Sequence, residues 1–155
     1  MAENLIIAKG GKEQKYELLH KQIESLVAGE SDTIANMANI AAMIHTTFGF
    51  WWTGFYRVVG EELVLGPFQG PLACSRIRYG RGVCGTAWKE KRTLVVPNVE
   101  QFPGHIACSS TSKSEIVAPL LKDGEVVAVL DIDSEHLATF DETDRLWLER
   151  IMELM

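Results

Sequence analysis

Residues 114–134 read SEIVAPLLKDGEVVAVLDIDS and decide the fold expected for this chain. The two halves, residues 114–121 and 125–132, are rich in β-branched and aliphatic side chains, which is typical of strands. Between them stands Lys122-Asp123-Gly124, and an Asp-Gly pair favours the tight turn of a β-hairpin. This stretch therefore predicts two neighbouring antiparallel strands.

Two amphipathic helices are predicted ahead of this hairpin. Residues 12–28 carry apolar side chains at helical spacing, and Gly29 follows as a stop signal. Ser31 and Asp32 are candidate N-caps for a second helix, which Gly49 ends. The apolar faces are Tyr16, Leu19, Ile23, Leu26 and Val27 in the first helix and Met37, Ile40, Ala41, Ile44 and Phe48 in the second.

The remaining segments predict more strands and two further helices. Residues 50–59 and 62–68 flank a turn at Gly60 and indicate a second hairpin. A short helix is expected at residues 82–91 and a strand at residues 94–96, and Asp141 with Asp144 forms a capping box for a last helix. This order predicts an α+β fold, in which helices pack against an antiparallel sheet, and residues 1–155 are expected to form a single domain.

Composition excludes several classes of protein. The chain has 155 residues, of which 46% are hydrophobic and 23% are charged, as in an ordinary globular domain. Its net charge is −6 without a basic stripe, which argues against nucleic-acid binding. The apolar run from Leu5 to Ala8 is too short for a secretory signal, and no run is long enough for a membrane helix. We therefore expect a cytoplasmic protein, and no motif indicates a cofactor.

Cys108 stands in an unusual place for a cysteine. Free cysteines are usually buried, yet Cys108 lies in the long irregular stretch between Pro97 and Ser112, among proline, glycine, serine and threonine. Long loops in compact domains are usually functional or disordered. The sequence therefore favours a reactive thiol at Cys108.

Three carboxylates are predicted to gather on the hairpin of residues 114–134. Asp131 and Asp133 stand at positions i and i+2 of one strand and hence share a face of the sheet. Glu115 begins the strand expected to pair with it. Neighbouring carboxylates in a dry site separate their pKa values, so that one can hold a proton near neutral pH. Strand-end aspartates are also ordinary turn and cap formers, and this alternative stays open.

The predicted strand at residues 50–59 is dense in aromatic side chains. Alternation places Trp51 and Phe55 on one face and Trp52 and Tyr56 on the other. One face must join the core, whereas the other either lines an apolar pocket with a polar hydroxyl or is covered by helices.

Cys74 and Cys84 are separated by ten positions across a segment rich in glycine and arginine, which can bend them toward one site. CxxC pairs are absent, and His105 is the one histidine near a cysteine in the sequence, so no metal is expected. Cys84 by itself also fits a buried helix thiol.

Seven motifs, in this order, resemble the free methionine-(R)-sulfoxide reductases, which are single GAF-domain enzymes. The motifs are WTGFY, LVLGPFQG, AC, GRGVCGTAW, FPGHIAC, SKSEIV and VLDIDS, and the resemblance extends from about Gly29 to the last helix. It implies a GAF domain with a six-stranded antiparallel sheet and helices on its faces. Ser109, Asn98 and Arg78 depart from the family pattern, and the C-terminus is short.

The resemblance also implies roles for particular residues. Cys108 matches the cysteine that forms the sulfenic acid, Cys74 the principal resolving cysteine, and Cys84 a further cysteine that relays the disulfide. The carboxylates match substrate-binding positions, and Asp133 is our candidate proton donor. The family further implies free methionine-R-sulfoxide as substrate, thioredoxin as reductant and a homodimer. The implied substrate-binding residues are Trp52, Tyr56, Glu115, Asp131 and Asp133.

Two other functions fit parts of the sequence. A non-catalytic GAF module that binds a small ligand such as a nucleotide would not need three cysteines and would be expected to carry an output domain. A cysteine hydrolase would pair Cys108 with His105 or His136, but the sequence shows no orienting third residue for such a pair.

Overall fold

The computed structural model describes residues 4–105, 108 and 110–155, and one antiparallel sheet organises it. The strands are β1 (Trp52–Val59), β2 (Glu62–Gln69), β3 (Arg76–Arg78), β4 (Leu94–Val96), β5 (Ser114–Lys122) and β6 (Glu125–Ser134). Their order in the sheet is β3-β2-β1-β6-β5-β4, and every neighbouring pair is antiparallel. The predicted α+β class and six-stranded antiparallel sheet are therefore confirmed.

The hairpin expected at residues 114–134 forms the centre of one half of the sheet. Asp123 and Gly124 have φ angles of 52° and 79°, and positive φ at both central residues is what a tight hairpin turn requires. Strand β6 continues two residues beyond the predicted Ile132 and includes Asp133. Its other edge pairs with β1, which joins the two hairpins into one sheet.

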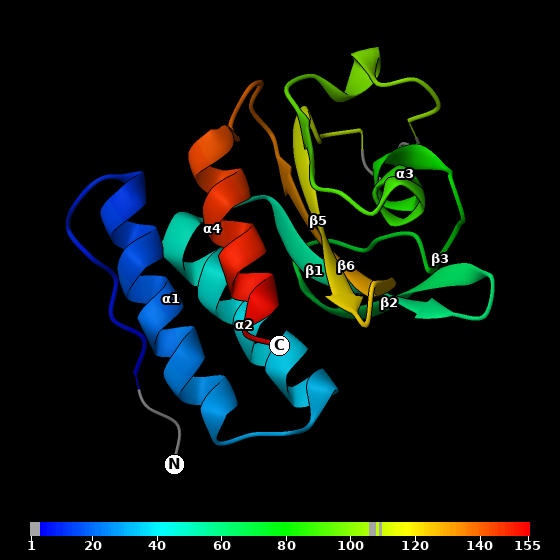
Figure 1. The fold of residues 1–155 in the computed structure, drawn as a ribbon. Helices are drawn as coiled ribbons and strands as arrows, with labels where there is room; N and C mark the ends of the chain where they lie inside the picture. Colours follow the sequence, from blue (N-terminus) through cyan, green and yellow to red (C-terminus); the bar gives the residue numbers. More distant parts are fainter. Residues whose placement is uncertain (1–3, 106–107, 109) are drawn as a thin grey trace.

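Helices cover both faces of the sheet. The elements α1 (Lys12–Ala28), α2 (Thr33–Phe48) and α4 (Glu142–Glu153) lie on one side, and α3 (Gly82–Glu90) lies on the other (Figure 1). The predicted caps are present: Asp32 accepts a hydrogen bond from the Ala35 amide, and Asp141 and Asp144 form the capping box of α4. Burial of the apolar helix faces against the sheet supplies the main stabilisation, because helices of this length are marginal alone.

Two hydrophobic cores result, one on each face. The core under the three helices includes Phe55, Ile116, Leu130 and Ile132 from the sheet. The core under α3 includes Trp52, Tyr56, Val117 and Val129 together with Cys84. Successive residues of β6 therefore belong to opposite cores, as the period of two dictates.

Strand β3 was missed by the sequence analysis. It has only three residues, of which Arg76 and Arg78 are exposed and Ile77 is buried, too short a segment for alternation to be recognised. A short 3-10 helix, Val99–Gln101, was also missed in the long loop after β4. Asn98 caps this helix by accepting a hydrogen bond from the Glu100 amide at 3.0 Å. Asn98 and Arg78 are two of the three departures from the family pattern. The remaining one, Ser109, lies outside the described residues.

Candidate active site

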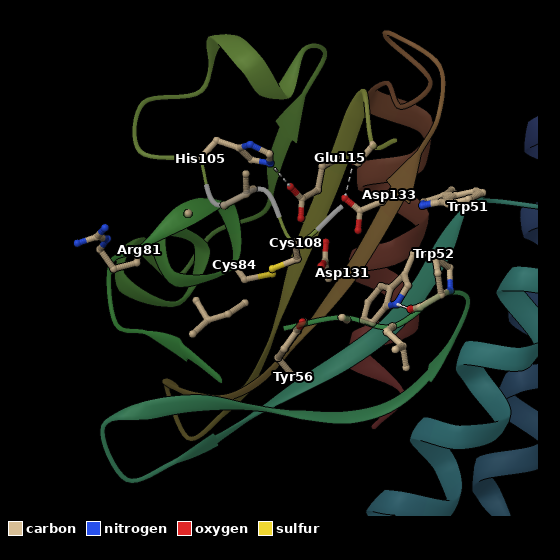
Figure 2. A pocket seen from close by; sticks show the side chains of 17 residues that line it. Trp51, Trp52, Tyr56, Arg81, Cys84, His105, Cys108, Glu115, Asp131 and Asp133 are labelled. Carbon is tan, nitrogen blue, oxygen red and sulfur yellow. Dashed lines mark hydrogen bonds and ion pairs between the residues drawn. The ribbon is translucent and has the colours of Figure 1, made fainter. Parts of the chain in front are cut away.

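A pocket lies over the sheet face that α3 covers. It is bounded by β1, β5, β6, the first turn of α3 and the loop that carries Cys108 (Figure 2). Its cavity volume is about 60 Å³. The pocket brings together the predicted residues Trp52, Tyr56, Cys84, Cys108, Glu115, Asp131 and Asp133.

Two of the three cysteines are joined at the edge of this pocket. Cys74, between β2 and β3, forms a disulfide with Cys108, and their Cα atoms are 5.6 Å apart. Cys108 is exposed, whereas Cys74 is half-buried. The loop position predicted for a reactive Cys108 is therefore matched by access to solvent and to a second sulfur.

Cys84 is the free thiol of the three. It lies in the first turn of α3 and is 4% exposed. Burial and the nearby charge of Asp131 raise the pKa of the Cys84 thiol well above its usual value. Cys84 is thus a protonated thiol that faces the carboxylates. It is buried in a helix and also lines the pocket, so both readings of Cys84 from the sequence agree with the structure.

The three carboxylates converge as predicted. Asp131 and Asp133 point from β6 to the face opposite Ile132, and Glu115 stands directly across from Asp133 in the β5–β6 register. Burial, reinforced by the charge of Asp131, raises the pKa values of Glu115 and Asp133 well above those of ordinary carboxyl groups. Burial also raises the pKa of Asp131, but its contacts with Glu115 and Cys84 oppose part of this rise. Of the three carboxyl groups, Glu115 and Asp133 therefore keep a proton to higher pH than Asp131, which ionises most readily.

Two polar neighbours of these acids were not singled out as site residues from the sequence. Ser112 donates a hydrogen bond to Asp133 Oδ1 at 3.0 Å. His105 places Nε2 4.0 Å from Glu115 Oε1, and burial lowers the pKa of His105. The sequence offered His105 as a hydrolase partner of Cys108 and as the one histidine near a cysteine for a metal site, but it gave no signal for the approach of His105 to Glu115.

Aromatic rings form the opposite wall. The Trp52 ring stacks 5.9 Å from Tyr56 and 5.2 Å from Phe68, measured between centroids. Hydrogen bonds fix both rings, since Trp52 Nε1 donates to the Pro71 carbonyl at 3.0 Å and the Tyr56 hydroxyl donates to the Cys74 carbonyl at 2.8 Å. Trp52 and Tyr56 therefore lie on one face of β1, as alternation predicts, and both line the pocket.

Trp51 departs from its predicted place. Alternation put it on the same face as Phe55, which belongs to the three-helix core, yet Trp51 lines the pocket. The reason is that β1 begins at Trp52, so Trp51 lies in a bend where the strand period does not apply. Arg81, before α3, also borders the pocket and was not predicted.

The fold and the pocket are those of a GAF domain. The family model described as "GAF domain" matches residues 32–155. "GAF domain-containing protein A" of Dictyostelium discoideum is 60% identical over 156 residues, covering 100% of this chain and 99% of that protein. The "Free methionine-R-sulfoxide reductase" of Escherichia coli is 41% identical, with coverage of 91% and 86%.

A solved structure is similarly close. The free methionine-R-sulfoxide reductase of Neisseria meningitidis, determined in complex with its substrate, has 54% identity and a TM-score of 0.95, covering 97% of this chain and 92% of that one. The chain therefore belongs to the GAF-domain family, in the branch whose relatives are named free methionine-R-sulfoxide reductase. The family resemblance inferred from the sequence motifs is confirmed.

Among the described residues, no helix combines the length and apolar character needed to cross a membrane.

Proposed function

We propose that this protein reduces free L-methionine-(R)-sulfoxide to methionine. The observation that carries this proposal is the disulfide between Cys74 and the exposed Cys108 at the mouth of a pocket floored by three carboxylates, of which two are buried and one is half-buried. The relatives from E. coli and N. meningitidis, which carry this activity in their names, support the choice of substrate.

The pocket has complementary groups for each part of such a substrate. The acidic floor suits the ammonium group, and an ionised Asp131 balances its charge. The rings of Trp52 and Tyr56 offer an apolar wall to the S-methyl group. A protonated Asp133 can donate a hydrogen bond or proton to the sulfoxide oxygen, which a carboxylate could not do.

The reaction proceeds in three balanced steps. The Cys108 sulfur attacks the sulfoxide group while the sulfoxide oxygen is protonated; the substrate's S–O bond breaks, the oxygen becomes bonded to the Cys108 sulfur as a sulfenic acid, and methionine leaves with its sulfur reduced. The Cys74 thiol then attacks this sulfenic acid, a disulfide forms and water departs. A dithiol, for which we propose thioredoxin, reduces the disulfide by exchange and becomes a disulfide itself.

Cys84 has a less direct place in this scheme. Its sulfur is buried and protonated, so it is a poorer attacking group than Cys74 in the arrangement described. We propose Cys84 as a relay thiol that takes over the disulfide from Cys74 and Cys108 by exchange. We further propose that residues 1–155 act as one domain in a homodimer in the cytoplasm, where reducing conditions can recycle the disulfide.

Release of methionine from separated R and S sulfoxides, free and peptide-bound, with a thioredoxin system, tests the substrate. Turnover of the free R form alone is expected, and equal turnover of peptide-bound sulfoxide would contradict the proposal. Cys108→Ser should abolish turnover, whereas Cys74→Ser should allow about one turnover per protein and then stall. Continued cycling of the Cys74 variant with thioredoxin would transfer the resolving role to Cys84.

Asp133→Asn tests the proton donor. The amide keeps the shape of the side chain but cannot transfer the proton, and general acid catalysis contributes about 10²–10⁴-fold. We expect a fall in kcat of that size without a change in the number of titratable thiols. A loss below about tenfold would remove Asp133 from the role of acid.

A further inference from the structure

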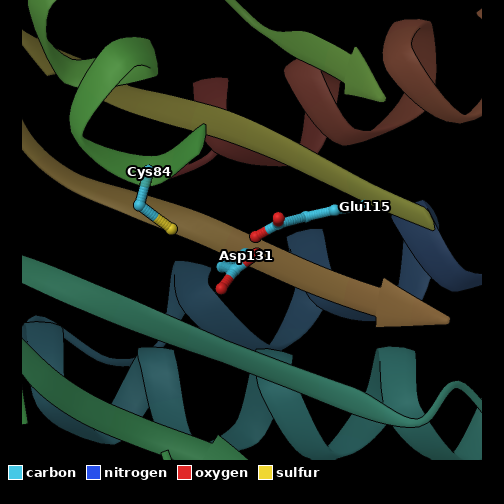
Figure 3. Close-up of side chains that lie close together, drawn as sticks. All are labelled: Cys84, Glu115 and Asp131. Atoms are coloured by element: carbon cyan, nitrogen blue, oxygen red, sulfur yellow. The ribbon is translucent and has the colours of Figure 1, made fainter. Parts of the chain in front are cut away.

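Cys84, Glu115 and Asp131 form a compact set of metal-ligating side chains. Their donor atoms, one sulfur and two carboxylate oxygens, all lie within 4.8 Å of one another, and all three residues are buried. They come from α3, β5 and β6, and their side chains converge on one point (Figure 3). The disulfide between Cys74 and Cys108 does not involve this set.

An unpartnered oxygen lies within the same cluster. Asp131 is 6% exposed, and its Oδ1 atom is buried without a hydrogen-bond partner in the described part of the chain. Buried carboxylate oxygens are normally paired, because leaving one without a partner costs about 1–3 kcal/mol or more. Within residues 4–105, 108 and 110–155, the one basic group within 4.0 Å of Glu115 or Asp131 is His105. In the described part of the chain, Asp131 Oδ1 therefore has neither a hydrogen-bond donor nor a basic group paired with it.

We propose that Cys84, Glu115 and Asp131 bind zinc(II). An ion at the centre of an equilateral triangle with 4.8 Å sides would lie about 2.8 Å from each donor, and shorter sides bring it closer. Zinc–sulfur bonds are about 2.3 Å and zinc–oxygen bonds about 2.0–2.2 Å, so modest side-chain rotation suffices.

The donor set also selects the metal. Magnesium and calcium prefer six or more oxygen ligands, whereas a thiolate with two carboxylates suits zinc. All three residues line the pocket, so the fourth tetrahedral position is open to water or to another ligand. No metal was expected from the sequence because it carries no CxxC pair. Cys84 reaches the two carboxylates only through the way α3 packs on the sheet, which no local pattern shows.

The zinc site does not depend on the proposed reductase activity, but one consequence does. Glu115 and Asp131 are also the groups proposed to bind the ammonium of methionine sulfoxide. Zinc and the free amino acid are therefore expected to exclude each other from the pocket.

Cobalt(II) is the probe that tests the site, because cobalt–thiolate bonds absorb in the near ultraviolet. The intact protein is used with its disulfide oxidised, so that Cys84 is the free thiol among the three. We expect the absorption to saturate at one cobalt per chain and to vanish when zinc is added. No thiolate band, or a band that zinc leaves unchanged, would overturn the proposal.

Variants then assign the ligands. Cys84→Ser should abolish the band, and Glu115→Gln should weaken zinc binding by at least tenfold, since even residues behind the ligands contribute about 10–100-fold. Asp133→Asn is the matched control: it removes a neighbouring acid that is not in the set, and we expect less than about threefold change. Near-ultraviolet circular dichroism checks that each variant is folded. Equal weakening by Glu115→Gln and Asp133→Asn would overturn the ligand assignment.

The same variants separate this proposal from the reductase proposal. Asp133→Asn is expected to lose turnover and keep cobalt binding. A wild-type protein that binds cobalt through Cys84 but does not reduce methionine sulfoxide would refute the proposed function alone. An active reductase without the cobalt band would refute the zinc site alone. Free methionine-(R)-sulfoxide should lower the cobalt affinity of the oxidised protein, and an unchanged affinity would contradict the shared use of the two carboxylates.

Discussion

Replacing Gly54 with alanine should destabilise the protein and disturb the pocket together. Gly54 lies in β1 between the pocket residues Trp52 and Tyr56. A Cβ atom at this position would lie 2.6 Å from Cη2 of the Trp52 ring, and it would overlap Phe68 Cβ as well. Ordinary contact begins near 3.4 Å, so the Trp52 ring must move by about 0.8 Å, and the backbone that carries Phe68 Cβ must move as well.

The expected cost follows from this overlap. Overpacking a well-filled site costs about 1–3 kcal/mol, and alanine recovers about 0.4–1 kcal/mol by restricting the unfolded chain. The net loss should be about 1–2 kcal/mol in the free energy of unfolding. For a chain of this length, that corresponds to a fall in Tm of about 2–8 °C.

Urea denaturation of the oxidised protein, followed by tryptophan fluorescence, measures this loss. Gly29→Ala is the control, because no described atom outside its chain neighbours would lie within 4 Å of a Cβ at that position, and we expect a change within about 0.5 kcal/mol. Under the proposed function, displacement of Trp52 should also raise KM for methionine sulfoxide. A Gly54→Ala protein with the stability and near-ultraviolet spectrum of the wild type would refute the reasoning.

Three further perturbations test other parts of the structure. Tyr16→Phe removes the hydroxyl that donates to buried Asp144 Oδ1 at 2.6 Å and should lower the unfolding free energy by about 1–3 kcal/mol; an unchanged urea midpoint would contradict this contact. Reducing the Cys74–Cys108 disulfide opens a loop with a sequence separation of 34. By the chain-entropy relation this should lower the free energy of unfolding by about 3–4 kcal/mol. Equal urea midpoints with and without reductant would show that the bridge does not constrain the unfolded chain. Burial lowers the pKa of His45 below 6.5, so the unfolded chain binds its proton first and stability should fall as pH drops below 6.5; His45→Gln should flatten this decline, and identical pH profiles would exclude His45 as its source.

Local patterns were sufficient for most of the fold. The hairpin at residues 114–134 combines two apolar strands with an Asp-Gly turn, and the helix at residues 142–153 has its capping box. Both signals lie within a few residues, so the sequence shows them directly. Strand β3 and the face of Trp51 were not predicted correctly, because three residues carry no period and a bend before a strand does not follow its alternation.

The candidate site was predictable only in part for a related reason. Asp131 and Asp133 share a face through strand periodicity, and the hairpin brings Glu115 opposite. The approach of Cys84 to Asp131 depends on how α3 crosses the sheet, which no local pattern encodes. His105 approaches Glu115 through the path of a long loop, and such paths are set by packing rather than by turn residues.

The alternation of side chains along β6 limits which mutations this strand can accept. Leu130 and Ile132 hold the three-helix core, while Asp131 and Asp133 face the pocket. Inserting or deleting a single codon within this strand would exchange the two sets, sending acids into hydrocarbon and hydrocarbon into the pocket. Substitutions can tune either face separately, but a library built on length variation in β6 should yield few folded members.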